Sequence, residues 1–285
     1  MTKITTQKLA LLGNIIRQDV IKSIYAAQSG HPAGSLGMAD IITVLYFYSL
    51  RHNPKNPKWN ARDRLILSNG HICPVLYAAL ARAKYFSVST LPTLRKLGSH
   101  LQGHPHRGEL PGIETSSGPL GSGLSQGIGM ALAAKMDKKH HRIIVLGSDG
   151  EHQEGNVWEA VMCAAKYTLD NLVYIIDRNY IQIEGNTEEV MPLDSLAKKY
   201  KAFNWHVLEI NGHRYEEIIN AIAAAQRIQG KPVVIIARTI PGKGVKYMEN
   251  DYQWHGKAPN NTETEQALQE LQQVRHQIEE NAYEY

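Results

Sequence analysis

The sequence predicts an α/β fold with a doubly wound, mainly parallel sheet and helices on both faces. Two short apolar runs, residues 143–146 and 172–176, have the length and composition of buried strands. A stretch with helical character, residues 152–167, lies between them. A strand, a helix and a second strand in this order form a right-handed parallel unit, and the same alternation recurs later in the chain.

The N-terminal part begins with helical patterning. In residues 7–28 the apolar side chains recur at spacings of three and four, which predicts an amphipathic helix. It should end at Ser29-Gly30-His31-Pro32, because glycine and proline stop a helix. A second helix is expected at 38–48. A polar loop, a short strand and a third helix should follow at 51–64, 65–68 and 73–82.

The rest of the chain alternates in the same way. Residues 98–118 are dense in glycine, proline and histidine and predict a long, irregular surface loop, followed by a small-residue helix at 124–135. Thr262 and Glu265 form a capping-box pattern that predicts a terminal helix, either packed back on the domain or docking a partner chain. We therefore expect one domain over residues 1–260 and a C-terminal helical extension over 261–285. Two further strands are expected at 206–210 and 232–237, around a helix at 215–229.

Composition narrows the class of protein. The chain has 285 residues with 31 basic and 27 acidic side chains, and the basic ones are scattered, so nucleic acid is not an expected partner. Only Cys73 and Cys163 are present, far apart, as in a reduced cytosolic chain. The N-terminus has no apolar run of a signal peptide, and no stretch approaches the roughly 18 apolar residues of a membrane span. We expect a cytoplasmic protein.

Polar residues follow two consecutive predicted strands. Asp149 comes after the run 143–146, and Asn179 comes after 172–176. Because ligands bind at the carboxyl ends of parallel strands, both side chains should lie at one ligand-binding edge. A carboxylate, an amide oxygen and backbone carbonyls suit Mg²⁺ or Ca²⁺ that carries a phosphate. Each residue could also simply close a turn.

Four histidines stand beside glycine in irregular segments: His31, His71, His104 and His255. Any one could be a surface turn residue, but together they suit a polyhydroxylated or phosphorylated substrate, because histidine moves protons near neutral pH. The run 118–123 contains a Gly-x-Gly pattern, yet polar residues precede it instead of a strand, so a nicotinamide site is not expected. Its glycines would bring backbone amides close to another flat or phosphate-bearing ligand.

Taken in order, these motifs resemble the amino-terminal part of transketolase, a thiamine-diphosphate enzyme, over nearly the whole chain. The Asp149-Gly150 pair followed about thirty residues later by Asn179 matches the family's thiamine-diphosphate signature. The other matching motifs are Ser29-Gly30-His31-Pro32, Ser68-Asn69-Gly70-His71, Gly103-His104-Pro105 and Gly118-Pro119-Leu120-Gly121. Ser148 and Ser122 depart from the pattern, where glycine and glutamine are usual.

The resemblance implies roles for individual residues. Asp149, Asn179 and the backbone carbonyl of Ile181 would hold Mg²⁺, for which Ca²⁺ or Mn²⁺ could substitute, on the diphosphate. His31, His104 and His255 would face the sugar and move protons, and Glu154 would lie at the subunit interface beside the cofactor and take part in binding and catalysis. The remaining cofactor contacts would come from His71, Gly118, Pro119, Leu120, Gly150 and His255.

The resemblance also implies the reaction and a partner. A two-carbon ketol unit would pass from a ketose phosphate donor to an aldose phosphate acceptor. Because a complete transketolase is more than twice this long, the chain resembles the amino-terminal subunit of a split enzyme. Its carboxyl-terminal partner would carry the pyrimidine-binding domain, in a heterotetramer of two of each chain, and this chain alone would be inactive. The alternatives are the alpha subunit of a 2-oxoacid dehydrogenase and a non-catalytic cofactor-binding module.

Overall fold

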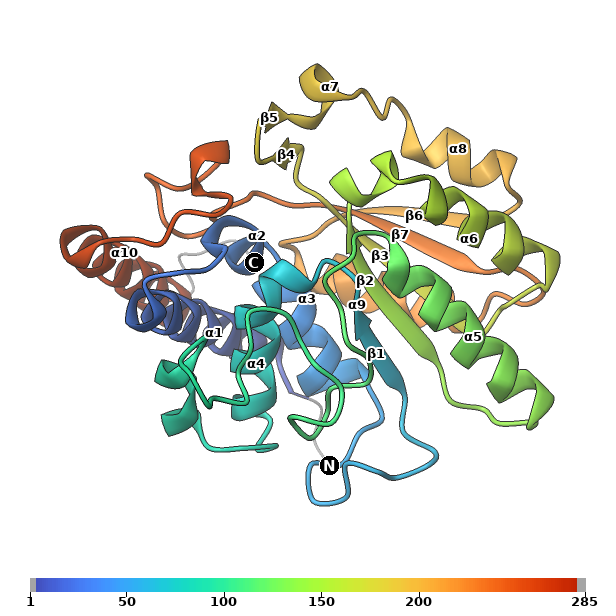
Figure 1. Cartoon of the computed structure of the whole chain (residues 1–285), viewed down its shortest axis with the longest axis horizontal. Coiled ribbons are helices and arrows are strands. Elements are labelled where there is room, and N and C mark those ends of the chain that lie inside the picture. The colour runs from blue at the N-terminus through green and yellow to red at the C-terminus, as the bar shows by residue number, and fades with distance from the viewer. Residues whose placement is uncertain (1–3, 281–285) are drawn as a thin grey trace.

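The computed structural model of the chain describes residues 4–280 and contains a five-stranded parallel sheet (Figure 1). The order across the sheet is β1-β2-β3-β7-β6, and every neighbouring pair runs parallel. The predicted α/β class with a parallel sheet is confirmed. The strands are β1 (Arg64–Leu67), β2 (Ile143–Ser148), β3 (Leu172–Arg178), β6 (His206–Asn211) and β7 (Val233–Arg238).

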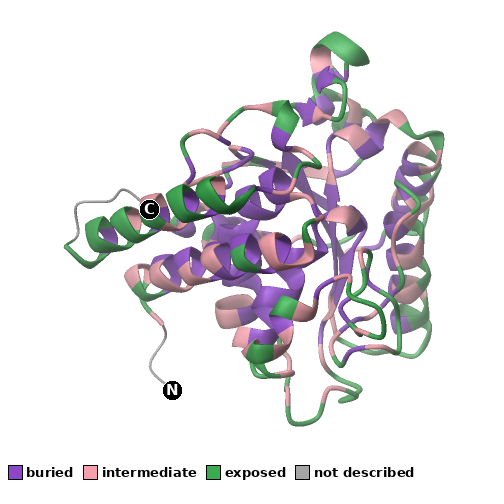
Figure 2. Ribbon diagram, turned by 60° about the vertical axis from the view of Figure 1, so that its left-hand side comes forward, coloured by how far each residue is buried: buried purple, intermediate pink, exposed green. Residues whose placement is uncertain are grey.

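Helices cover both faces of this sheet, as Figure 1 shows. Alternate strand residues enter two separate cores: Ile144 and Leu146 pack on one side, and Ile143 and Val145 on the other. The inner strands β2 and β3 are therefore buried on both faces, whereas the edge strand β6 is partly exposed. The outer sides of the helices are exposed (Figure 2). The first face carries α1 (Thr6–Ala27), α2 (Pro32–Gly37), α3 (Ala39–Val44), α4 (Cys73–Arg82), α9 (Tyr215–Ala225) and α10 (Asn261–Glu279). The second carries α5 (Ser122–Met136), α6 (Gly155–Lys166) and α8 (Leu196–Ala202).

Short elements follow the carboxyl ends of the strands, where ligands bind in such sheets. After β1 comes the 3₁₀ turn Gly70–Ile72, and after β2 comes the 3₁₀ turn Gly150–Gln153. The remaining short elements are a π-helical turn at Leu45–Ser49, 3₁₀ turns at Val88–Thr93 and Tyr252–Trp254, the hairpin β4 (Ile181–Gln182) with β5 (Gly185–Asn186), and α7 (Thr187–Val190).

Several predicted boundaries need correction. The strand expected at 172–176 continues to Arg178, because the side chains of Asp177 and Arg178 find buried partners and the parallel pairing goes on. The helix expected at 152–167 is divided, since Glu154 adopts an extended conformation before α6 begins. The helix expected at 215–229 ends at Ala225, ahead of Gly230 and Pro232, which disfavour its continuation. The elements between residues 181 and 202 were not expected.

The terminal helix has a different cap from the predicted one. Asn260, in an extended conformation, accepts from the Glu263 backbone N–H at 2.9 Å, and Glu263 accepts from the Asn260 N–H at 2.8 Å. The expected Thr262 cap is wrong, because Thr262 already lies inside the helix. Helix α10 packs on α1, where Asn14 donates to the Leu271 carbonyl at 2.9 Å. The domain boundary at residue 260 stays a prediction.

Two smaller findings complete the fold. The segment 98–118 is irregular as expected, but it is not wholly a surface loop, since Leu101, Leu110 and Ile113 are buried in the first core. Within residues 4–280, every helix is too short or too polar to cross a membrane.

Candidate functional site

Asp149 lies at the end of β2 with no exposed surface. Its Oδ1 accepts from the Gly150 backbone N–H at 2.8 Å, and its Oδ2 accepts from the Tyr180 N–H at 2.8 Å and from Arg178 Nη1 at 3.1 Å. Burial raises the pKa of Asp149 to about 6, although the Arg178 charge and these hydrogen bonds oppose the rise. Because each carboxylate oxygen can accept two bonds, Oδ1 retains a lone pair for a cation.

Asn179 lies just beyond the end of the neighbouring strand and is also buried. Its amide nitrogen donates to Asp177 Oδ2 at 2.9 Å, and its oxygen accepts from the Ile181 N–H at 3.0 Å. Thr239 donates to the other oxygen of Asp177, and burial raises the pKa of Asp177 to about 7. The structure therefore brings Asp149, Asn179 and the start of β4 at Ile181 to one edge of the sheet, as the sequence predicts.

Three of the four predicted histidines form one cluster. The ring centres of His31 and His71 are 5.0 Å apart, those of His31 and His255 are 5.5 Å apart, and those of His71 and His255 are 5.1 Å apart. His104 lies beside Gly118, where an added Cβ would be 3.7 Å from the His104 ring. Although these histidines come from four separate segments, the fold brings them together.

The histidine cluster is kept uncharged near neutral pH. Burial, and then the neighbouring His255 and Arg95, lower the pKa of His31 to about 4. Burial also lowers the pKa of His71 far below its usual value, and the pKa of His255 and His104 below theirs. A neutral imidazole can donate through one nitrogen and accept through the other, so the cluster can bind hydroxyl and carbonyl oxygens alike.

Buried polar atoms beside this cluster lack hydrogen-bond partners among the described residues. They are both side-chain atoms of Asn69, Ser117 Oγ and His31 Nδ1. Gly70 follows Asn69, and a Cβ there would lie only 2.4 Å from Ser117 Oγ, so the two segments meet closely. Since buried polar groups in native proteins are almost always hydrogen-bonded, these atoms fit a site that receives a polar ligand.

The glycine-rich segment 118–123 lies against the end of β2. Gly118 and Gly121 have φ values of 146° and 76°, which favour glycine, and Gly121 caps α5. Pro119 and Leu120 are exposed, and the Leu120 carbonyl accepts from Asn156 at 3.1 Å. Gly150 faces open space apart from Gln182, 4.0 Å from where its Cβ would be.

Glu154 was predicted at a subunit interface. It is exposed at the N-cap of α6, three residues after Glu151, and its place at an interface stays a prediction.

Three residues of the site were not predicted as such. Arg178 pairs with Asp149 and also with Glu188 at 2.5 Å. Arg95 donates to Ser29 Oγ at 2.8 Å, and its charge lowers the pKa of His31 and His104. Glu151 is fully buried against the glycine-rich segment. Arg178 and Glu151 could have been predicted, because a charged residue within or just after a buried strand indicates a functional site. No local sequence pattern indicated Arg95.

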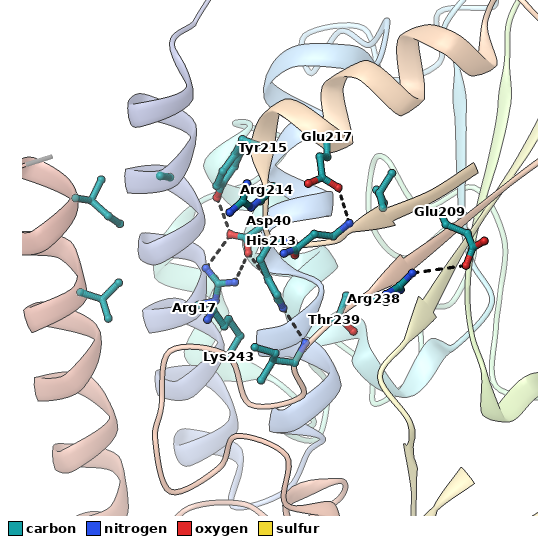
Figure 3. A pocket seen from close by; sticks show the side chains of 16 residues that line it. Arg17, Asp40, Glu209, His213, Arg214, Tyr215, Glu217, Arg238, Thr239 and Lys243 are labelled. Carbon is teal, nitrogen blue, oxygen red and sulfur yellow. Dashed lines mark hydrogen bonds and ion pairs between the residues drawn. The ribbon is translucent and has the colours of Figure 1, made fainter. Parts of the chain in front are cut away.

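A second polar cluster lines a separate cavity of about 560 Å³ (Figure 3). Asp40 accepts from both terminal nitrogens of Arg17, from Tyr215 and from His213 Nδ1 at 2.8 Å. The backbone N–H of Ile240 donates to His213 Nε2 at 2.7 Å, so this nitrogen carries no proton and Nδ1 is the donor. The cavity contains none of the predicted site residues, but its network fixes the segment after β7.

Within the described residues, no group of three or more His, Cys, Asp or Glu side chains is arranged to hold a metal ion. The predicted metal ligands are of another kind, with one carboxylate, one amide and one backbone carbonyl. This mixed oxygen set is compatible with a magnesium ion that keeps waters or phosphate oxygens as its other ligands.

The fold and site belong to the class of thiamine-diphosphate-binding domains. The family model described as "Transketolase, thiamine diphosphate binding domain" matches residues 8–283. The chain belongs to the transketolase family, which confirms the resemblance inferred from the motifs.

Similar proteins include short subunits and complete enzymes. The chain is 44% identical over 255 residues to one subunit of the apulose-4-phosphate transketolase of Phocaeicola vulgatus, covering 90% of both chains. It is 43% identical over 242 residues to the 6-deoxy-6-sulfo-D-fructose transketolase subunit SqwG of a Clostridium species, covering 85% of this chain and 88% of that one. The crystal structure of transketolase from Campylobacter jejuni superposes with a TM-score of 0.89 at 36% identity, covering 94% of this chain but 43% of the other.

The chain thus spans less than half of the complete transketolases that it matches, and nearly the full length of the short subunits.

Proposed function

We propose that this chain is the cofactor-binding subunit of a two-chain transketolase, which transfers a two-carbon ketol unit from a ketose to an aldose. The observation that carries the proposal is the pairing of two features at one sheet edge. Asp149 and Asn179 present oxygens at the strand ends, and three neutral histidines lie within 5.5 Å of each other. The identities of 44% and 43% to two proteins named as transketolase subunits support the division into two chains.

The proposed cofactor is thiamine diphosphate with Mg²⁺, which Ca²⁺ or Mn²⁺ could replace. Asp149 through Oδ1, Asn179 and the carbonyl of Ile181 would hold the metal on the diphosphate, with Gly150 leaving room for it. The segment Gly118-Pro119-Leu120 would lie against the aminopyrimidine. When bound, this cofactor supplies the carbon nucleophile and electron sink for breaking the bond next to a ketose carbonyl.

The histidines of this chain would bind and orient the sugar. His31 and His255, kept neutral by burial, can donate to a carbonyl oxygen or accept from a hydroxyl, and can move a proton between them. His71, whose ring centre is 5.0 Å from that of His31 and 5.1 Å from that of His255, would contact the cofactor. His104 would contact the sugar from beside Gly118. The unpartnered atoms of Asn69 and Ser117 offer further hydrogen bonds to a polyhydroxylated ligand.

The substrate class we propose is a ketose with an anionic substituent. Arg95 places a positive charge beside His31 and His104, where a phosphate or sulfonate would be attracted. The similar subunits are named for apulose 4-phosphate and for 6-deoxy-6-sulfo-D-fructose, which carry such groups. The ordinary sugar phosphates of pentose phosphate metabolism fall within the same class.

We propose that the partner is a carboxyl-terminal subunit with the pyrimidine-binding domain, in a heterotetramer of two of each chain. Leu120, 41% exposed, and Glu154 lie beside the site where such a partner would contact this chain. The two free cysteines, Cys73 and Cys163, support a cytoplasmic location. The family match favours this function over a 2-oxoacid dehydrogenase subunit.

The test is reconstitution from separately purified chains. The chain, its candidate partner and the mixture are each assayed for ketol transfer with thiamine diphosphate and Mg²⁺, using ketose phosphates and a sulfoketose as donors. We expect activity only in the mixture, and loss of it with Asp149→Asn. Robust transfer by this chain alone would contradict the need for a partner, and a mixture inactive on every ketose would contradict the function.

A further inference from the structure

Glu151 is a fully buried carboxylate that accepts three hydrogen bonds from three segments of the chain. Its Oε1 accepts from Ser68 Oγ at 2.6 Å and from the Gly121 backbone N–H at 2.7 Å. Its Oε2 accepts from the Ser148 N–H at 2.9 Å. Ser68 Oγ in turn accepts from the Gly123 N–H at 3.2 Å, so the glycine-rich segment is held at two points.

Each of these three segments carries residues of the candidate site. Ser68 comes directly after β1 and is followed by Asn69, Gly70 and His71. Gly121 belongs to the segment with Gly118, Pro119 and Leu120. Ser148 immediately precedes Asp149. One carboxylate therefore sets the spacing between a histidine of the cluster, the glycine-rich segment and the predicted metal ligand.

The approach of these segments is close. An added Cβ at Gly123 would lie 2.5 Å from the Ser68 side chain, and one at Gly121 would lie 2.1 Å from Asn156. The absence of a side chain at these glycines allows the segments to approach, but it provides no force that holds them together. The attraction comes from Glu151, since hydrogen bonds to an ionised acceptor are stronger than those between neutral groups.

Burial raises the pKa of Glu151, and the hydrogen bonds that it accepts oppose this rise. Its donors, a serine hydroxyl and two backbone amides, are neutral. Asp149, in contrast, shares its charge with the Arg178 guanidinium at 3.1 Å. Arg178 also pairs with Glu188 at 2.5 Å, so its charge is divided between two carboxylates. Glu151 differs from Asp149 in being held by hydrogen bonds from neutral donors.

We propose that Glu151 is a positioning residue of the metal–diphosphate site. It holds the glycine-rich segment and the end of β2 in the arrangement that receives the cofactor. This inference rests on the proposed function for the identity of the bound group. It assigns to Glu151 no direct contact with metal or cofactor.

The test compares three variants of the full chain, alone and together with its partner subunit. Glu151→Gln removes the charge and points an amide N–H₂ at one of the donors, while keeping the size of the side chain. Ser68→Ala removes one donor and keeps the charge. Glu216→Gln, at an exposed position in the first turn of α9, is the matched control.

Two measurements separate positioning from simple stability. Amide hydrogen exchange of the cofactor-free chain reports the Gly121 and Ser148 N–H groups, and we expect faster exchange at both in Glu151→Gln. Titration with Mg²⁺ and thiamine diphosphate gives dissociation constants, which we expect to rise about tenfold to a hundredfold in Glu151→Gln, as for other residues that support metal ligands. We expect a rise of less than about threefold in Ser68→Ala, because Gly121 and Ser148 still donate to the carboxylate, and no change in the control.

The outcomes distinguish this inference from the proposed function. Exchange rates and dissociation constants within twofold of the wild type in Glu151→Gln, or a lowered melting temperature with unchanged dissociation constants, would overturn the inference. If the wild-type complex binds no thiamine diphosphate, the proposed function fails instead. The exchange measurement then still decides whether Glu151 holds the two segments.

Discussion

Replacing Asp40 by asparagine should destabilise the protein strongly. The Asp40 and Arg17 side chains are only 5% and 8% exposed and meet at 2.5 Å. Burial alone would raise the pKa of Asp40, but Arg17 and His213 hold it well below its usual range, so the carboxylate is charged at pH 7. Asp40→Asn removes the carboxylate that accepts two hydrogen bonds from the buried Arg17 guanidinium, and breaking such a buried pair costs about 3 to 5 kcal/mol. We expect this loss in urea unfolding at pH 7.

The Asp40→Asn prediction has a matched control and a double-variant test. Asp137→Asn removes an exposed carboxylate and should change the unfolding free energy by less than about 0.5 kcal/mol. The double variant with Arg17→Met should lose at least about 1 kcal/mol less than the two single losses combined, because both single variants break the same ion pair. A loss below about 1 kcal/mol in Asp40→Asn, or strictly additive losses, would refute the reasoning.

Three further predictions concern the site and its surroundings. His255→Ala should depress turnover of the reconstituted enzyme much more than it weakens cofactor binding, and equal losses in steady-state kinetics and titration would count against a proton-transfer role. Burial lowers the pKa of His152 from 6.5 to about 4, so the unfolded chain takes up its proton first as the pH falls. Stability should therefore drop by about 2 kcal/mol between pH 7 and pH 5 on account of this residue. In urea unfolding, His152→Gln should lose about 2 kcal/mol less stability between pH 7 and pH 5 than the wild type does. The same pH dependence in both proteins would show that His152 is not its source. Chelation of divalent cations should abolish thiamine diphosphate binding to the reconstituted enzyme and Mg²⁺ should restore it, whereas binding that persists in chelator would rule out a metal at Asp149.

Regular elements with strong local signals were predicted well from the sequence. The helix Cys73–Arg82 was predicted at both ends, since Pro74 suits a first helical turn and Arg82 a last one. The apolar run 143–146 marked β2, although the strand goes on to Ser148. Elements that depend on distant partners were missed, as with α2, which starts at Pro32 immediately after the predicted break. A local pattern predicted the break but not that a new helix would follow it.

In the candidate site, too, residues with a local sequence pattern were predicted and residues that depend on distant partners were missed. Asp149, Asn179 and the histidines were found because they stand beside glycine or at the ends of apolar runs. Glu151 follows closely after Asp149 in the sequence, yet its three donors come from residues 68, 121 and 148. Which distant groups a buried charge will meet depends on the packing of the sheet and the glycine-rich segment. That packing leaves no periodicity in the sequence, so the hydrogen-bond partners of Glu151 became visible only in three dimensions.

One side of the candidate site consists of buried, hydrogen-bonded side chains, and the other side is exposed. Glu151, Arg178 and Thr239 bind the strand ends from within the fold, whereas Leu120 and Glu154 are exposed next to them. Charge that develops during ketol transfer must be stabilised by fixed groups and shielded from water, because water competes for the same hydrogen bonds. The described residues give this chain the fixed groups but leave that flank uncovered. A second protein surface would have to close it, which is why we expect the histidines to become productive only when the partner subunit is bound.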